Sequence, residues 1–206
     1  MLKIWGRLSS INVQKVVWAA QEAGVAFERT DAGGSFGLVG TDWYRALNPN
    51  RLVPVIEDEG FVLWESNAIV RYLAAKYAPG RLYPDELNRR FDAERWMDWQ
   101  QTTLNPAGRD AFMQLIRTPQ AQRNAALIEQ SRTRTAPLLQ MLDAHLATRR
   151  FMIGDDFTMA DIPVGCQIHR WFGLPIDQTP LPHLERWYRE VSTRAAARSV
   201  LTLPIT

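Results

Sequence analysis

LVPVIEDEGFVLWESNAIVRY, residues 52–72, is the stretch of sequence that decides the fold. Residues 53–56 form a short apolar run, residues 57–60 are polar and end in glycine, and residues 61–64 form a second apolar run. Two short apolar runs joined by such a turn are typical of a β-hairpin. Residues 65–67, ESN, then open a helical pattern of apolar residues. The stretch therefore predicts a strand, a turn, a second strand and a helix.

Two positions in this stretch carry chemistry. Proline has no N–H group, so Pro54 must lie at the end of a strand, at an edge or at a special peptide bond. Base rates alone favour an ordinary trans bond there. The first N–H groups of the following helix carry partial positive charge and attract an anion. Ser66 can equally cap these groups with its own hydroxyl, so both interpretations stay open at this point.

The composition excludes several classes of protein. The 206 residues include 24 Lys and Arg against 22 Asp and Glu, and a net charge of +2 gives no electrostatic footprint for nucleic acid or a membrane surface. Cys166 is the only cysteine, which rules out an internal disulfide and a CxxC dithiol and fits a reducing compartment. We find no signal-peptide pattern and no apolar run of the ~18–20 residues that span a bilayer. We therefore expect a soluble, cytoplasmic protein without nucleic-acid or membrane partners.

The residues before the 52–72 stretch predict a small α/β unit. Residues 2–5 alternate like a strand, residues 13–20 repeat at helical spacing, and residues 25–30 form a second strand. Residues 31–40 hold four glycines without the order of a phosphate-binding loop, and a short helix follows them. The predicted order is βαβ, then α, then ββα. Such an order gives a compact unit whose sheet contains one parallel crossover and one hairpin.

The second half of the chain predicts helices only. Residues 79–84 are rich in proline and glycine and look like a linker, and no convincing strand pattern follows them. Pro137 falls inside one long helical pattern and should kink it or split it in two. The predicted fold class is α/β + all-α. Its parts are an N-terminal unit at residues 1–78, a linker at residues 79–87 and an all-helical domain at residues 88–206.

One local pattern in this half predicts a folding device. Residues 158–161, TMAD, form a capping box in which Thr158 caps the first helix N–H groups and Asp161 returns a hydrogen bond to the Thr158 N–H. Cys166 lies on the apolar helical stretch that follows, so a buried structural thiol is expected. The histidines have no metal-ligand spacing, and no metal site is expected. They are His145, His169 and His183.

Four segments, in order, resemble the cytosolic glutathione transferases. Residues 48–54, NPNRLVP, look like the family's NPxGKVP signature, and residues 64–69, WESNAI, look like its ESxAI signature. Residues 6–16, GRLSSINVQKV, resemble the first loop and helix of the serine-type bacterial classes. Residues 156–162, DFTMADI, are similar to the family's capping motif in the helical domain. The resemblance implies a thioredoxin-like N-terminal domain and glutathione as the co-substrate.

The resemblance also implies how glutathione is held. Pro54 would be cis, which lets the Val53 backbone pair with the cysteinyl backbone of glutathione. Ser66 and the helix N-terminus would take the carboxylate of the γ-glutamyl group, and Glu65 would favour its ammonium group. Asn67, the next residue, is also expected to bind glutathione. A helix end that attracts an anion beside a fixed acid suits this zwitterion.

The resemblance aligns Ser10 with the family's catalytic serine. The thiolate of glutathione is the nucleophile, and a hydroxyl that donates to sulfur near a helix N-terminus stabilises it. Each unit by which the thiol pKa falls needs about 1.4 kcal/mol. Ser10 would then be a donor and not a nucleophile, although a plain N-cap is the alternative. Asn12 is the second candidate donor to sulfur, and Ser9 is the third.

The chain departs from the family pattern at two places. Arg51-Leu52 stand where the family usually has Gly-Lys, and Leu52 cannot pair with the glycyl carboxylate of glutathione. Arg51 either replaces that contact or faces solvent. The position of the redox cysteine of thioredoxin relatives is a serine here, so any disulfide chemistry must use the sulfur of glutathione itself.

Three functions follow as hypotheses. The first is a homodimeric transferase in detoxification, adding glutathione to small electrophilic, apolar substrates. The second, motivated by Asn12, is glutathione-dependent reduction of a disulfide or peroxide. The third, motivated by Arg51-Leu52, is a glutathione-transferase-like binding protein without catalysis. In an enzyme, aromatic and apolar side chains of the helical domain could wall the second-substrate pocket. They are Trp96, Trp99, Phe112, Met113, His169 and Trp171.

Overall fold

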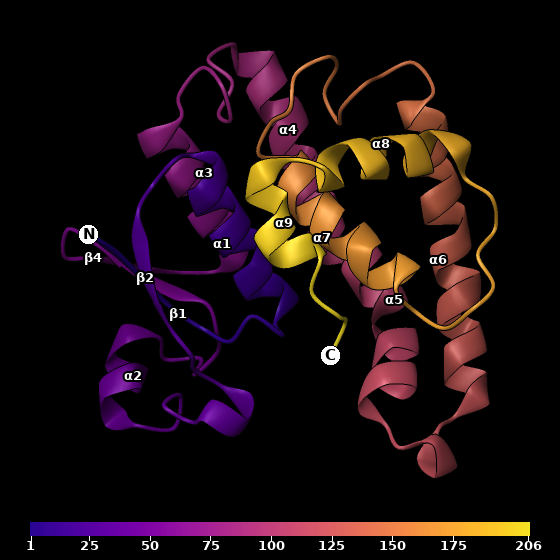
Figure 1. Cartoon of the computed structure of the whole chain (residues 1–206), viewed down its shortest axis with the longest axis horizontal. Helices are drawn as coiled ribbons and strands as arrows, with labels where there is room; N and C mark the ends of the chain where they lie inside the picture. Colours follow the sequence, from indigo (N-terminus) through magenta and orange to yellow (C-terminus); the bar gives the residue numbers. More distant parts are fainter. The chain divides into compact units, whose positions relative to one another are not determined.

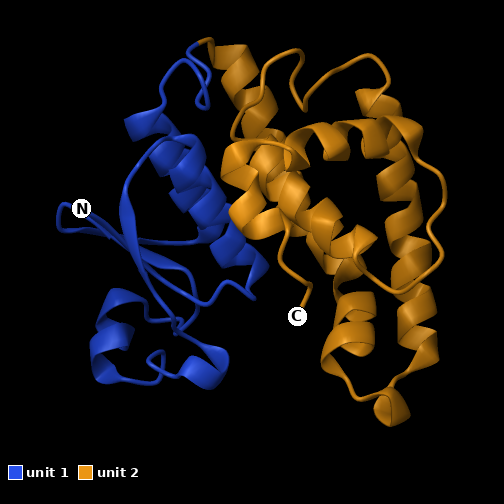
Figure 2. Ribbon diagram, in the orientation of Figure 1, with its two compact units in different colours: residues 1–85 blue, residues 86–206 orange.

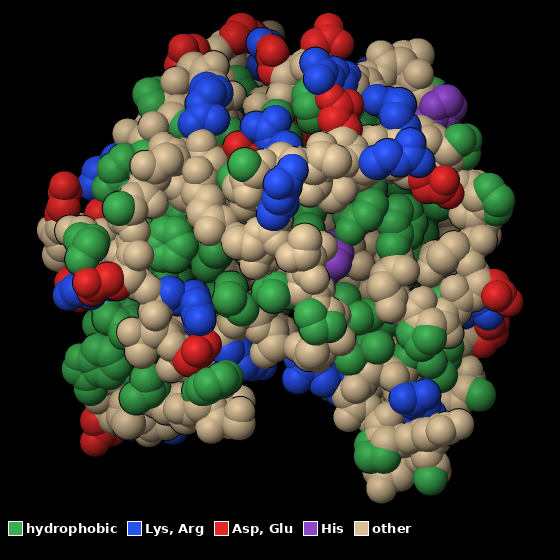
Figure 3. Space-filling model, in the orientation of Figure 1, with side chains coloured by type: hydrophobic (Ala, Val, Ile, Leu, Met, Phe, Trp, Pro, Cys, Tyr) green, Lys and Arg blue, Asp and Glu red, His purple; other side chains and the backbone are tan.

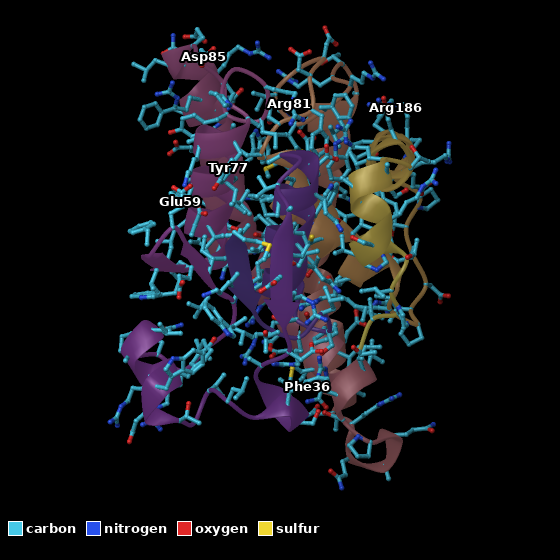
Figure 4. All side chains as sticks on the ribbon, turned by 60° about the vertical axis from the view of Figure 1, so that its left-hand side comes forward. Phe36, Glu59, Tyr77, Arg81, Asp85 and Arg186 are labelled. Carbon is cyan, nitrogen blue, oxygen red and sulfur yellow. The ribbon has the colours of Figure 1, made fainter.

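The computed structural model describes all 206 residues, which form two compact units, Met1–Asp85 and Glu86–Thr206 (Figure 2). Most of residues 79–87, where the sequence predicts a linker, belong to the first unit. Leu82 is fully buried, and the Arg81 guanidinium donates to the Glu22 carbonyl at 2.6 Å (Figure 4). The chain therefore passes from one unit to the other close to Asp85.

The first unit contains the four predicted strands and the helices between them (Figure 1). Its elements are β1 (Leu2–Trp5), α1 (Ile11–Glu22), β2 (Phe27–Thr30), the 3-10 turn η1 (Gly34–Phe36), α2 (Asp42–Leu47), β3 (Val55–Asp58), β4 (Phe61–Trp64) and α3 (Ser66–Tyr77). The predicted combination of an α/β unit with an all-helical unit is confirmed. Strand β2 begins two residues later than predicted, and β3 begins after Pro54 rather than around it.

The sheet has the strand order β2-β1-β3-β4. β1 and β2 are parallel, whereas β1–β3 and β3–β4 are antiparallel, which gives the predicted crossover and hairpin. α1 and α3 pack against each other on one side of the sheet, and α2 lies away from them (Figure 1). The apolar spacing explains this packing, since Val13, Val16 and Ala20 of α1 have no exposed surface. The core of this unit thus holds α1 and α3 against the strands.

The second unit is all-helical, as predicted. Its elements are α4 (Leu87–Trp99), η2 (Gln100–Leu104), α5 (Asn105–Phe112), η3 (Met113–Arg117), η4 (Gln120–Gln122), α6 (Ala125–Leu146), α7 (Asp161–Phe172), α8 (Pro182–Ser192) and α9 (Ala195–Leu201). The two segments η2 and η3 are π-helical turns, which the apolar spacing does not predict. No helix in the structure is both long enough and apolar enough to cross a membrane.

Pro137 does not divide its helix, because α6 continues through it from Ala125 to Leu146. The prediction that the helix might split in two is therefore wrong. A proline removes the hydrogen bond to the carbonyl four residues earlier, here that of Thr133. Both Thr133 and Pro137 are exposed, so water can satisfy the freed carbonyl.

Asp161 joins three parts of the second unit. Its Oδ2 accepts from the Thr158 N–H at 2.9 Å, which confirms the predicted return bond of the capping box. Its Oδ1 accepts from the Met152 N–H at 3.0 Å and from the Trp187 indole N–H at 2.9 Å. Thr158 Oγ1 accepts from the Ala160 N–H at 3.4 Å, which agrees with the predicted cap, although the regular part of α7 begins only at Asp161. Burial raises the pKa of Asp161 to about 6, although these donors oppose the shift.

Candidate functional site: one end of the sheet

The strand register brings three predicted site segments to the same end of the sheet. Trp5, the last residue of β1, pairs with Val55, the first residue of β3, and Val55 pairs with Trp64, the last residue of β4. The residues just beyond this rung are the loop that leads to Ser10, the Val53-Pro54 pair, and Glu65-Ser66. The loop near the start of the chain and two segments from the 52–72 stretch therefore meet at one end of the sheet.

α1 begins at this edge with its N-terminal N–H groups uncapped by any side chain. Ser10 is the N-cap residue, and its carbonyl accepts from the Val13 and Gln14 N–H groups at 3.0 Å. Ser10 is therefore the N-cap by position, as the plain alternative expects, but its hydroxyl makes no capping hydrogen bond. The hydroxyl remains at the positive end of a twelve-residue helix.

A close approach of β1 and α1 fixes the position of the loop between them. A Cβ atom on Gly6 would lie 2.4 Å from Val13 Cγ2, so only glycine allows α1 to pack this close. The Gly6 N–H donates to the Thr30 carbonyl at 2.9 Å, and the Gly6 carbonyl accepts from Arg29 Nη1 at 2.7 Å. Arg29 is held in turn by Asp31 at 2.5 Å. The start of the loop is therefore anchored to the end of β2.

Val53 presents an unpaired backbone at the same edge. Its N–H and carbonyl pair with no other backbone group, because the β1–β3 ladder begins at Val55. The preceding Leu52 carbonyl is held by the Tyr44 hydroxyl at 2.9 Å and the Asn48 amide at 3.0 Å. Burial raises the pKa of Tyr44 to about 12, so this hydroxyl stays a donor. The Val53-Pro54 peptide bond is cis, as the resemblance implies and against the base rate.

α3 also begins without a side-chain cap. Its N-cap is Glu65, in the left-handed region at φ 75°, and Ser66 is the first helical residue. The alternative in which Ser66 caps the helix as N-cap is therefore wrong. Ser66 is buried at 4% exposed surface and Asn67 at 7%, whereas Glu65 is exposed. The helix starts one residue earlier than an N-cap at Ser66 requires, and no side chain caps its first N–H groups.

The uncapped ends of α1 and α3 contrast with three other helices of the chain. N–H groups at the start of α2 donate to the Thr41 side chain, those of α4 donate to Glu86, and those of α6 donate to Asn124. The N-cap residues of α5, α7, α8 and α9 also make no side-chain capping bond. What distinguishes α1 and α3 is that both begin at the same end of the sheet, where their first N–H groups are two sets of donors for a ligand.

Asn12 and Ser9 lie beside Ser10 in the same loop and first helical turn. Both side chains are half-buried. The Oδ1 atom of Asn12 is buried without a hydrogen-bond partner, which is uncommon for a polar atom away from a binding site. A 180° rotation of the amide places its NH₂ group there instead. Asn12 therefore has an unused polar group close to the start of α1.

Arg51 and Leu52 lie on the exposed turn before Val53. Arg51 has φ 55° and is exposed, and Leu52 is 64% exposed. Figure 3 shows a group of hydrophobic side chains over α2, and Trp43 of this helix is 51% exposed. The turn thus carries one positive charge, that of Arg51, whose side chain makes no hydrogen bond or ion pair.

Comparison with known proteins assigns these features to a family. The model of the glutathione S-transferase N-terminal domain matches residues 9–76, and that of the C-terminal domain matches residues 104–195. The chain is 42% identical to glutathione S-transferase GstB of Escherichia coli strain K12, with 100% of each chain covered. The chain belongs to the glutathione S-transferase family.

Other glutathione S-transferases agree with this assignment. The theta class enzyme of Xanthomonas axonopodis pv. citri, whose crystal structure has glutathione bound, is 46% identical with a TM-score of 0.96, covering 100% of this chain and 99% of the other. Glutathione S-transferase 3 of Zea mays is 29% identical over 99% of this chain and 95% of its own length. The family and fold suspected from the sequence are confirmed.

The six side chains expected to wall a second-substrate pocket have different surroundings in this glutathione S-transferase. Trp96 packs edge-on against Trp99 at 5.3 Å between ring centroids and contacts His145 at 4.5 Å. His169 binds the Tyr188 hydroxyl at 2.8 Å and the Leu203 carbonyl at 3.0 Å, so it holds the C-terminal segment. A cavity of about 230 Å³ lies in the helical unit, and of the six only Trp171 lines it.

Three residues of the site escaped the sequence analysis. Gly6, Arg7 and Arg29 shape or border the loop that carries Ser10, yet none of them stands at a motif position that was given a role. The available signal was weak, since Gly6-Arg7 opens the segment that resembles the family's first loop. No group of three or more His, Cys, Asp or Glu side chains in the structure could hold a metal ion. Cys166 is buried, as predicted, and forms no disulfide.

Proposed function

We propose that this glutathione S-transferase binds glutathione along the sheet edge between α1 and α3. The supporting observation is that two uncapped helix starts and the unpaired Val53 backbone meet at this edge. The γ-glutamyl carboxylate would bind at the start of α3, where Ser66 and Asn67 are buried. The cysteinyl backbone would pair with the free N–H and carbonyl of Val53, as an added strand does.

Glu65 supports the zwitterionic character of this subsite. It is exposed and directly precedes the anion-attracting helix start. Its carboxylate can bind the ammonium group of the γ-glutamyl residue while the α3 N–H groups bind the carboxylate. A left-handed residue other than glycine is uncommon, and such strain is found at ligand-binding positions. Glu65 is therefore proposed as the residue that selects the γ-glutamyl end.

Ser10 is proposed to act on the sulfur of glutathione. With the cysteinyl group at Val53, its sulfur faces the start of α1, where the Ser10 hydroxyl is not used for capping. The hydroxyl donates to the thiolate, and the helix end adds favourable electrostatics. Stabilisation by about 1.4 kcal/mol lowers the thiol pKa by one unit. The thiolate then attacks an electrophilic carbon of a small apolar substrate and forms a C–S bond. Either a leaving group such as halide departs with its electron pair, or the addition product takes up a proton.

The unpartnered amide of Asn12 favours a second candidate activity, the reduction of a disulfide or a hydroperoxide. A second donor beside the sulfur stabilises a glutathione thiolate both as attacking and as leaving group. For a hydroperoxide the balance is two glutathione thiols consumed, with one glutathione disulfide, one alcohol and one water formed. The chain has only the buried Cys166, so both sulfur atoms come from glutathione.

Steady-state conjugation of glutathione with a generic aryl halide tests the proposed function. We expect Ser10→Ala to lower kcat/KM by about tenfold or more, since one donor to the thiolate is lost. Ser9→Ala is the matched control, one residue away, and should change kcat/KM less than about threefold. A Ser10→Ala loss below threefold, about 0.7 kcal/mol, removes Ser10 from this role. Turnover of a mixed disulfide or hydroperoxide that exceeds conjugation and falls in Asn12→Ala supports the second candidate.

We also propose that the enzyme is a homodimer. β4 is the edge strand of the sheet, and Phe61 on it is 51% exposed while its ring contacts Tyr72 at 5.4 Å. A large apolar side chain on an open edge is a frequent site of association. Light scattering after gel filtration should give twice the 23.6 kDa of one chain. Phe61→Glu should shift the enzyme toward monomer, and a monomeric wild type contradicts the proposal.

A further inference from the structure

The guanidinium of Arg7 is a positive charge at the same end of the sheet, and the proposed function gives it no role. Its N–H donates to the Ala32 carbonyl at 3.2 Å, and its side chain extends across the backbone of Gly33 and Gly34. A Cβ on Gly33 would lie 2.8 Å from Arg7 Nη1, and one on Gly34 would lie 3.2 Å from Nε. No acidic side chain pairs with the guanidinium. An arginine so placed is a preformed binding group for a carboxylate.

The two glycines leave the room that the guanidinium occupies. Gly33 has φ 79° and Gly34 has φ 61°, both in the left-handed region that favours glycine. The same Cβ position on Gly33 would lie 3.4 Å from Val53 Cγ1. The tip of Arg7 and the side chain of Val53 thus border one glycine. The cation therefore neighbours the residue proposed to pair with the cysteinyl group of glutathione.

The order of the strands places Arg7 where the third residue of glutathione ends. In the order β1-β3-β4, Ser66 follows β4, Val53 precedes β3 and Arg7 follows β1. Neighbouring strands lie about 4.8 Å apart, so the distance from β4 to β1 is about 10 Å. An extended tripeptide also spans about 10 Å. With its first residue at Ser66 and its second at Val53, glutathione presents its glycyl carboxylate near Arg7.

Resting on the proposed function, we propose that Arg7 is the cation that binds the glycyl carboxylate of glutathione. Leu52, at the family's lysine position, carries no charge for this contact. Arg51 is the competing cation, but it is exposed on a turn and must lose side-chain entropy on binding. Arg7 is half-buried against Gly33 and Gly34, so less entropy is lost.

Isothermal titration of the full-length enzyme with two ligands tests this assignment. The ligands are glutathione and its monoethyl ester at the glycyl carboxyl, which removes only that charge. We expect the wild type to bind the ester about 10- to 100-fold more weakly than glutathione, the range for one charge-assisted contact. Arg7→Met should bind glutathione more weakly than the wild type by the same factor. Its dissociation constants for glutathione and for the ester should agree within threefold. Arg51→Met is the matched control and should keep the wild-type preference for glutathione.

Each other outcome contradicts either the proposed function or the role of Arg7. If the wild type binds neither ligand at millimolar concentration, the proposed function fails, and this inference fails with it. If the wild type binds glutathione and the ester equally, or if Arg7→Met keeps the wild-type preference, only the role of Arg7 fails. Loss of the preference in Arg51→Met alone assigns the contact to Arg51 instead. Arg7→Lys keeps the charge and should retain part of the preference, which separates this role from a loss of folding.

Discussion

Arg29 Nη1 lies 2.7 Å from the carbonyl oxygen of Gly6, so the end of β2 holds the first residue of the loop that leads to Ser10. The contact joins residues that are 23 positions apart: Arg29 lies on β2, and Gly6 directly follows the neighbouring parallel strand β1. It gives Arg29 a positioning role, because Arg29 does not itself lie at the proposed sulfur site. Asp31 also accepts from Arg29 Nη1, at 2.5 Å, and so helps to hold the guanidinium in place.

Arg29→Met should loosen the loop without removing any group that touches glutathione. We expect the free energy of unfolding to fall by about 1.5–3 kcal/mol, the range for a hydrogen bond to a charged group. We also expect kcat for conjugation to fall more than the affinity for glutathione, since Val53 and α3 remain in place. Urea denaturation and steady-state kinetics measure the two effects. Arg45→Met, at an exposed ion pair with Asp42, is the control and should change neither.

Gly6→Ala should separate α1 from the sheet. The new Cβ would meet Val13 Cγ2 at 2.4 Å, so α1 or the loop must shift. Overpacking of this kind costs about 1–3 kcal/mol, and the shift should also displace Ser10. Thermal unfolding and the conjugation assay report both changes. Gly40→Ala is the matched control, because a Cβ there meets nothing within 4 Å; an equal loss in both variants would contradict the packing argument.

Asp161→Ala should destabilise the helical unit strongly. The change leaves the Thr158 N–H, the Met152 N–H and the Trp187 indole N–H buried without their acceptor. We expect a loss of about 3–5 kcal/mol in the free energy of unfolding, measured in urea. Asp156→Ala is the control, because the ion pair of Asp156 with Arg89 is exposed. A similarly small loss of unfolding free energy in both variants would contradict the claim that Asp161 joins three parts of the unit.

Asp58 should make stability depend on pH in the acid range. Burial alone would raise its pKa, but hydrogen bonds from Lys76, Tyr77 and Tyr72 outweigh burial and lower it. Figure 4 shows Tyr77 on α3 and Glu59 at the adjoining hairpin, where this cluster lies. Because the folded pKa is below the unfolded value of about 3.9, the carboxylate stabilises the fold above that pH. This contribution is lost as the pH falls through the folded pKa.

The variant Asp58→Asn tests this dependence. We expect it to be about 2–4 kcal/mol less stable than the wild type at pH 6, and the difference should shrink below pH 4. Chemical denaturation at several pH values gives the comparison. Asp42→Asn, at a carboxylate whose side chain is 90% exposed, should show almost no difference at any pH. A difference for Asp58→Asn that does not change with pH would show that the charge is not responsible.

Much of the fold could be predicted because short-range patterns report it directly. The hairpin of β3 and β4 follows from two apolar runs around a polar turn ending at Gly60, and the helical half follows from apolar spacing. The exact start of α3 could not be predicted, since Ser66 is the better cap by type and Glu65 takes that place only with φ 75°. Tertiary packing overrides local preference there.

The site could be predicted only as far as its segments match a family. Ser10, Val53 and Ser66 were found through motifs, and the strand register brings their segments to one edge. The contacts of Gly6 with Val13 and of Arg29 with Gly6 depend on the approach of separate elements, which no periodicity encodes. The same holds for the π-helical turns within the long helical run of the second unit.

The thiol pKa of enzyme-bound glutathione tests the central claim most directly. Thiolate absorbance near 240 nm, recorded against pH for the wild type and for Ser10→Ala saturated with glutathione, gives this value. A free cysteine thiol titrates near pH 8.5, and we predict a midpoint at least about one unit lower in the wild-type complex. Ser10→Ala should raise the midpoint by about one unit while glutathione stays bound. A midpoint that is the same in both proteins would contradict the claim that the Ser10 hydroxyl stabilises the thiolate.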